Sequence, residues 1–429
     1  MEYKELDPKE KEKKNEENSI ISSEKVNMSH QSEFDYLKAF LLFLMINDHL
    51  YDSYSTGNYY VYKIMEFVIF VLGAGGFMLS MGVGMKYTRH HEPKDYIERA
   101  IILLTQGQLF YIVRDGLPNL IAYWASGNKM FISRAMLVFQ TDILTFSGIT
   151  FIFLALMKKI NVSDINIFLI SIILNIVALY LFNTFKPPSN YLLSQFLGNF
   201  IITDAESFFP FFNYFTFVAF GYWLGGILQR ITNKDKFYNL FLIVCLPFET
   251  IYYIFRKHYD FPGFPKYFTY LHYCVYPFPD SFASCICNVT ALAIFYKIDK
   301  MLKGKTPGFI THCGKRLNEY YIISSLFILN LKTILIIAKG EDFLSKMTSP
   351  HIFSIIIIIF SRIIIEINDK YIHFAITTLK KPLRNYIFAL IWIATIIILI
   401  YTYPKVESHA TVWNDYLKNG HNININYYK

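Results

Sequence analysis

Long apolar runs separated by short polar connections dominate the pattern of this 429-residue chain. A helix needs about 20 mostly apolar residues to cross the hydrocarbon core of a bilayer. Because backbone groups in lipid must find hydrogen bonds within the chain, we expect each such run to be a helix. The sequence predicts eleven spans, at 35–51, 63–85, 98–114, 134–157, 166–184, 208–228, 238–255, 278–297, 319–338, 350–367 and 385–402.

One further stretch, 116–133, is only partly apolar and contains Tyr123 and Trp124. It is expected to be an interfacial or re-entrant segment, or else a twelfth span. Runs such as 355–360 lack the alternation of outer-membrane barrel strands. The predicted fold class is therefore all-α, a polytopic membrane bundle of about eleven helices.

Three regions follow from this pattern. Residues 1–30 mix Lys and Glu with almost no apolar content, which is typical of a disordered, charged arm. Residues 31–403 form the transmembrane domain, and 404–429 are expected to be a short polar tail. The N-terminal arm has no apolar core of its own and is not expected to be a signal peptide.

Composition agrees with a membrane protein, since 54% of the residues are hydrophobic and only 17% are charged. The net charge of +8 arises in connecting loops, which gives nucleic-acid binding little support. Alternate connections hold 19 Lys and Arg against eight in the others, so we expect a cell-membrane protein with a cytoplasmic N-terminus. No metal-type spacing joins cysteines to histidines, and no metal is expected.

The first apolar run carries ionisable residues that an ordinary membrane anchor would lack, because each costs several kcal/mol near hydrocarbon. Lys38 and His49 are 11 residues apart, which places them within about 20° of one helix face and about 16 Å apart along the axis. Asp35 and Asp52 lie three residues from Lys38 and His49, respectively, on the same faces. Asp48 points elsewhere.

This arrangement has two interpretations. A carboxylate beside an imidazole fixes its tautomer and raises its basicity, which suits His49 to general-base catalysis. Alternatively, His49 lies at the membrane interface and Lys38 extends its amine to the membrane edge.

Several short segments, in this order and spacing, resemble the transmembrane acyltransferases, a superfamily that includes the acyltransferase 3 and heparan-alpha-glucosaminide N-acetyltransferase-like proteins. The first, Asp35-x-x-Lys38 with His49, resembles an Asp-x-x-Arg and His opening, although Lys38 lacks the planar fork of Arg. The others are Gly75–Gly82 with Lys86, Arg89 and Arg99–Leu104; Thr141–Leu144 with Gly148; Phe209-Pro210; Gly221–Gly225; and Gly314–Leu317 with Tyr320 and Tyr321.

The resemblance implies transfer of an acyl group, expected to be acetyl, from cytosolic acyl-CoA to a hydroxyl or amine of a glycan or glycolipid. His49 would remove the acceptor proton, and a transient acyl-His is the variant chemistry. Asp52 and Asp142 are assigned with His49 to catalysis. Lys38, Arg89 and Arg99 are assigned to the CoA phosphates, and Asp35 and Asp48 to the acceptor. Membrane lipid is an expected partner, and a homodimer is left open.

Other interpretations stay open. Arg89 and Arg99 suit topology determination equally well, and Asp142 suits a structural role. Arg114 and Asp115 are expected to form a local ion pair. A transporter or flippase for a polar or lipid-linked substrate also places polar groups inside a many-helix bundle. A non-catalytic membrane protein of the same fold is the third class.

Overall fold

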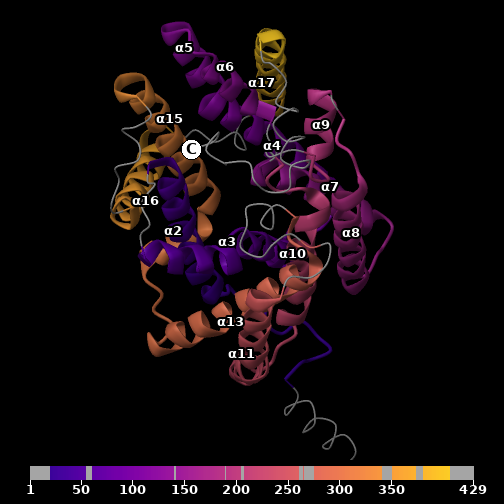
Figure 1. Cartoon of the computed structure of the whole chain (residues 1–429). Helices are drawn as coiled ribbons and strands as arrows, with labels where there is room; N and C mark the ends of the chain where they lie inside the picture. Colours follow the sequence, from indigo (N-terminus) through magenta and orange to yellow (C-terminus); the bar gives the residue numbers. More distant parts are fainter. Residues whose placement is uncertain are drawn as a thin grey trace, which may run out of the picture.

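The computed structural model of the chain is all-α (Figure 1). It describes residues 20–54, 60–139, 142–188, 190–203, 207–259, 264, 275–340, 350–372 and 380–405. Within these residues the only β-type pairing is an isolated bridge between Ile21 and Ile231. The C-terminal tail expected at 404–429 lies almost wholly outside the described residues.

The helices fall into long elements and short connectors. The long helices are α2 (Ser32–Tyr54), α3 (Tyr60–Tyr87), α4 (Pro93–Tyr111), α7 (Ile143–Lys159), α8 (Asp164–Thr184), α10 (Phe211–Leu228), α11 (Lys234–His258), α13 (Phe278–Met301), α15 (Leu317–Lys339), α16 (Pro350–Ile367) and α17 (Lys381–Thr402). The short ones are α5 (Leu117–Ser126), α6 (Lys129–Ala135), α9 (Tyr191–Gly198) and α14 (Gly308–Lys315), with π turns η1 (Ile112–Gly116) and η4 (Asn368–Ile372) and 3-10 turns η2 (Met136–Phe139) and η6 (Tyr403–Lys405).

Within the described residues, eight helices are long and apolar enough to cross a membrane, which supports a multi-pass membrane protein. Each coincides with a span predicted from the sequence. They are Ile64–Tyr87, Asp164–Thr184, Phe211–Leu228, Lys234–His258, Phe278–Met301, Leu317–Lys339, His351–Ile372 and Lys381–Lys405. The remaining three predictions correspond to α2, α4 and α7, which are helical but do not meet the same criteria of length, hydropathy and charge.

The structure differs from the expected single helix at 134–157. A 3-10 turn closes at Phe139, and α7 begins only at Ile143, where the Asp142 carboxylate accepts a hydrogen bond from the Ile143 N–H. Asp at this position ends one element and starts the next because it satisfies a free N–H of the first helical turn. Segment 116–133 forms the hairpin α5–α6, and its ten- and seven-residue helices are each too short to span a bilayer.

Helix α10 is the centre of one half of the bundle, where it packs on α3, α8 and α13 (Figure 1). Its side chains are buried almost all round, whereas α11 and α8 expose wide apolar faces. A helix whose side chains are buried on every side is one that neighbouring helices surround. This half provides the packed frame against which α2 lies.

Helix α2 joins that frame to the other half of the molecule. It contacts α3 and α13 on one side and α14, α15 and α16 on the other (Figure 1). Helices α4 and α7 pack closely together, and α17 contacts α4. The polar first helix is therefore an interior helix, which agrees with its need for polar partners.

Two glycines allow α3 and α10 to touch through their backbones. A Cβ on Gly221 would lie 2.2 Å from the Leu79 carbonyl oxygen, and a Cβ on Gly82 would lie 2.2 Å from the Val218 carbonyl oxygen. Small residues at a helix crossing permit this close approach. The van der Waals contacts that result are among the main interactions that hold helices together in lipid.

Replacing Gly221 with Ala is expected to destabilise the protein by about 1–3 kcal/mol, because the backbone of α3 would have to move. Thermal unfolding of the detergent-solubilised protein measures the effect. Gly84→Ala on the same helix pair is the matched control, since a Cβ there has no neighbour within 4 Å. Equal melting temperatures for the two variants would contradict the backbone contact.

Residues 20–31 are attached to the connection that follows α10. Val26 and Asn27 donate backbone hydrogen bonds to the Gln229 carbonyl, and Thr232 donates one to the Ile20 carbonyl. The structure therefore differs from the expectation of a disordered arm up to residue 30, although 1–19 lie outside the described residues. The composition of residues 20–30 does not reveal this docking because most of these hydrogen bonds are made by the backbone, with one further bond from the Asn27 side-chain amide to the Leu228 carbonyl.

Candidate functional site

Helix α2 carries predicted site residues at both of its ends. At the first end, Asp35 is buried, 2.8 Å from His30 Nε2, and its Cα would lie 2.7 Å from a Cβ on Gly314 of α14. Lys38 is half-buried one turn further on. His49 lies at the opposite end and is half-buried. The 11-residue spacing therefore lies on one continuous helix, as predicted.

A cavity of about 1020 Å³ lies beside this helix. Its walls come mainly from α2, α3, α4, α7 and α15, and residues of η1, α14 and η4 also line it. Lining residues on α4 run from Arg99 to Phe110, which corresponds to about 16 Å of helix axis, and Val113 of η1 extends the lining further. The cavity is thus long as well as large.

One end of the cavity is polar and reaches the surface. Four cations line it, Lys38, Arg99, Lys315 and Arg316, and we call these four the basic mouth. Arg99 and Lys315 are exposed, so this end is open. The structure thus brings together two of the three residues predicted to bind phosphate.

The middle of the cavity is apolar. Its wall includes Met45, Met81, Leu103, Phe110 and Leu326, contributed by four different helices. Such a wall accommodates an extended ligand segment that is apolar or weakly polar. Only a few polar groups are needed in the wall, at the points where they orient the ligand.

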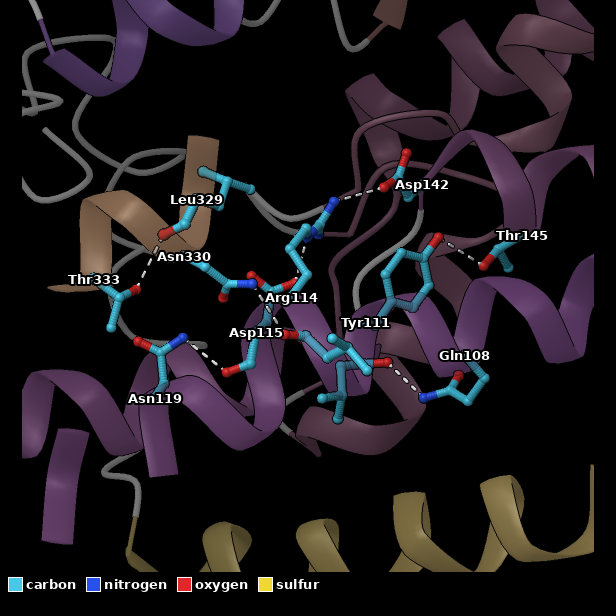
Figure 2. Close-up of polar contacts among 12 residues, drawn as sticks. Gln108, Tyr111, Arg114, Asp115, Asn119, Asp142, Thr145, Leu329, Asn330 and Thr333 are labelled. Atoms are coloured by element: carbon cyan, nitrogen blue, oxygen red, sulfur yellow. Dashed lines mark hydrogen bonds and ion pairs between the residues drawn. The ribbon is translucent and has the colours of Figure 1, made fainter. Parts of the chain in front are cut away.

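Arg114, Asp115 and Asp142 form a buried ionic cluster (Figure 2), which meets the cavity lining through Tyr321. Arg114 Nε donates to Asp115 Oδ2 at 2.6 Å, and Arg114 Nη1 donates to Asp142 Oδ2 at 2.9 Å. All three side chains are buried, with 8%, 8% and 10% of their surfaces exposed, respectively. A charge this deeply buried is tolerated only when paired and hydrogen-bonded.

The π turn η1 places Arg114 in this cluster. It inserts between α4 and α5 without breaking the helix, because the N–H of Leu117 donates to the Ile112 carbonyl. A π turn widens the helix by one residue, and such turns are frequent at functional sites. Asn119 fixes the turn by donating to the Asp115 carbonyl at 2.7 Å.

Tyr321 connects the cluster to the cavity. Its hydroxyl donates to the Asp142 carboxylate, 2.9 Å from Oδ1 and 2.8 Å from Oδ2, and its side chain lines the cavity wall. The Arg114 guanidinium also lies over the Phe110 ring, 4.8 Å from its centroid. Tyr321 is therefore the polar group through which a molecule in the cavity would meet the cluster.

His49 lies one helical turn beyond Met45 on α2, and it is not among the residues that line the cavity. Asp142 and Arg114 are close enough for their charges to act on its imidazole. The predicted neighbour Asp52 is exposed, and its charge acts on Tyr51. Pairing of His49 with Asp52 stays a prediction, whereas Asp142 is the carboxylate whose charge reaches His49.

Of the eight predicted site residues only Lys38 and Arg99 line the cavity, so Arg89 and Asp48 lie outside it, as do Asp35, His49, Asp52 and Asp142. Arg89 is exposed in the connection between α3 and α4 and is not part of the cavity lining. Asp48 is half-buried beside His49 in sequence and does not line the cavity either. Their assignments to CoA and to the acceptor stay predictions.

Sequence reasoning missed the wider role of Arg114, which was expected to pair only with Asp115. The pairing with Asp142 joins residues 28 positions apart and cannot be read from one helix. It also missed Lys315 and Arg316 at the basic mouth. The signal that favours Arg114 in retrospect is its position within one turn of Asp115 and Tyr111 in an otherwise apolar run.

Comparison with known protein families, with curated proteins and with solved structures found no match to this chain. The resemblance to transmembrane acyltransferases therefore stays a prediction that depends on the quoted segments alone.

Proposed function

We propose that this protein is a membrane acyltransferase that moves an acyl group, expected to be acetyl, from acyl-CoA to a hydroxyl or amine of a glycan or glycolipid. The observation that carries the proposal is the cavity. It joins a basic mouth to the Tyr321–Asp142–Arg114 cluster, and the charges of Asp142 and Arg114 act on His49.

The donor fits the cavity by charge and polarity. Lys38 and Arg99 attract the phosphates of CoA at the mouth, where cations gain most from multiply charged anions. The apolar middle then holds the extended pantetheine arm and directs the thioester towards Tyr321. Ser80, a buried residue of the cavity wall, has a hydroxyl with no partner among the described residues, which makes it available to a ligand.

His49 acts as the general base. Its neutral imidazole takes the proton from the acceptor O–H or N–H while the acceptor atom attacks the thioester carbonyl. The tetrahedral intermediate collapses, the C–S bond breaks, and the CoA thiolate receives the proton from the imidazolium. Asp142 is a positioning residue that acts on the imidazole, held in place by Arg114 and by its cap on α7.

The orientation predicted from Lys and Arg would put the basic mouth on the cytoplasmic side, because 297–318 is one of the Lys- and Arg-rich connections. The donor would then enter from the cytosol. His49, about 16 Å further along α2, lies towards the opposite side. The acceptor would reach it from outside the cell, so the acyl group alone crosses most of the membrane.

A transporter or flippase is the second candidate, and one observation favours it. Helix α3 is broken at Gly73, where φ is −33° and ψ is −109°. Discontinuous helices are common beside the substrate sites of transporters.

The test uses protein in nanodiscs with acetyl-CoA labelled in the acetyl group and membrane glycolipid as acceptor. We expect label in the glycolipid and release of free CoA thiol in equal amounts. The same protein in proteoliposomes gives the control for transport. Uptake of labelled glycolipid headgroup or of acetyl-CoA, without thiol release, would overturn the proposed enzyme activity and support a transporter.

A further inference from the structure

Arg316 at the cavity mouth is held by two carboxylates from different helices. It immediately precedes α15, and its Nε donates to Glu319 Oε1 at 2.7 Å, with a second bond from Nη2 to Glu319 Oε2. Its Nη2 also donates to Asp369 Oδ1 at 2.9 Å, with a second bond from Nη1 to Asp369 Oδ2. Four hydrogen bonds therefore occupy the planar fork that would otherwise grip an anion.

Asp369 reaches Arg316 from the π turn η4, which follows α16 directly. Arg316, Glu319 and Asp369 all line the cavity. Their side chains are 25%, 43% and 47% exposed, so water and dissolved ligands reach all three. The hydrogen bonds to Glu319 and Asp369 raise the pKa of the Arg316 guanidinium above its ordinary value, which keeps it charged. We name this group of three the mouth clasp.

The surroundings of the mouth clasp attract anions. Lys38, Arg99 and Lys315 line the same end of the cavity, and the N-terminal turn of α15 contributes Leu317 and Asn318 to the lining. The start of a helix carries partial positive charge and free N–H groups, which favours phosphate. Glu319 and Asp369 carry negative charges that repel an anion. A phosphate that enters therefore meets three cations outside the mouth clasp and a fourth, Arg316, that the clasp holds.

We propose that the mouth clasp is a specificity device that a phosphate-bearing ligand opens by taking the Arg316 fork from Asp369. A phosphate group carries up to two negative charges and several acceptor oxygens, so it competes with a single carboxylate. A ligand with only one negative charge gains less from the exchange and leaves the clasp closed. Identification of the ligand as CoA rests on the proposed function, whereas exchange at Arg316 requires only phosphate.

The test measures binding of CoA, inorganic pyrophosphate and neutral pantetheine to the purified full-length protein by calorimetry at fixed salt. Asp369→Asn removes the competing charge, and we expect CoA and pyrophosphate to bind roughly fivefold more tightly. Arg316→Gln should weaken both by about tenfold. Pantetheine binding should not change in either variant. Glu366→Gln is the matched control, because Glu366 pairs with Arg362 on the same α16 helix outside the cavity lining.

The outcomes separate this inference from the proposed function. Tighter pyrophosphate binding by Asp369→Asn, with no acyl transfer from any acyl-CoA, would support the clasp and remove the enzyme. Acyl transfer combined with unchanged CoA and pyrophosphate affinities in both clasp variants would overturn the clasp alone. The clasp would also be overturned if Asp369→Asn and Glu366→Gln raised the affinity for pyrophosphate equally. The increase would then come from the loss of a negative surface charge in general.

Discussion

Replacing His49 with Ala is expected to lower acyl transfer by roughly 10²- to 10⁴-fold, because the acceptor loses its general base in the transition state. Thiol release and label transfer, measured at saturating acetyl-CoA, give the rate. CoA affinity should stay within a factor of about two, since His49 does not line the cavity that contains the basic mouth. Binding that persists while turnover falls indicates that the variant is folded.

His90→Ala is the matched control, because His90 is exposed in the connection between α3 and α4. Its rate should equal that of the unchanged protein. If His49→Ala retained full activity, the role of His49 as base would be wrong, and the transfer would depend on another group. His49→Gln tests the same point with less change in side-chain volume.

Replacing Arg114 with Met is expected to destabilise the protein by about 3–5 kcal/mol, because it leaves Asp115 and Asp142 buried without their cation. Thermal unfolding in detergent measures the loss. The matched control is Arg362→Met, which breaks an exposed ion pair to Glu366. That change should cost well under about 1 kcal/mol, as exposed pairs usually do.

The origin of this loss can be tested by removing the stranded charges. Arg114→Met combined with Asp115→Asn and Asp142→Asn should recover a large part of the stability, since no unpaired charge then remains in the core. No recovery would mean that Arg114 stabilises the protein through packing on Phe110 and Tyr111 rather than through charge.

The sequence predicted the class of fold because length and hydropathy alone decide whether a helix can cross a membrane. The sequence predicted the ends of helices less well, because a single capping or turn residue can end a helix within an apolar run. Asp142 caps α7 and shortens the expected 134–157 helix, and hydropathy is insensitive to such a cap. The hairpin of α5 and α6 turns at Gly127, where φ is +68°, again a local backbone feature inside an apolar stretch.

The candidate site was predictable along one helix and much less so between helices. Lys38 and His49 follow from helical periodicity, and the structure places Lys38 in the cavity together with Arg99. Arg89 carries the same charge ten residues earlier but lies outside the cavity, which depends on how α3 and α4 are connected. The Asp142–Tyr321 contact joins residues 179 positions apart, one at the N-cap of α7 and the other on α15, so it depends on how distant segments of the chain are arranged.

The π turn at Ile112–Gly116 has a consequence for how this chain can vary. The π turn joins α4 to α5 without a break in the helix. The direction in which each side chain of α5 points therefore depends on the extra residue that the π turn contains. Loss of one residue there would rotate α5 by about 100° relative to α4. Exposed positions such as Ile121 can accept many apolar side chains. Insertions and deletions in the same stretch would turn Arg114 or Asn119 away from their partners.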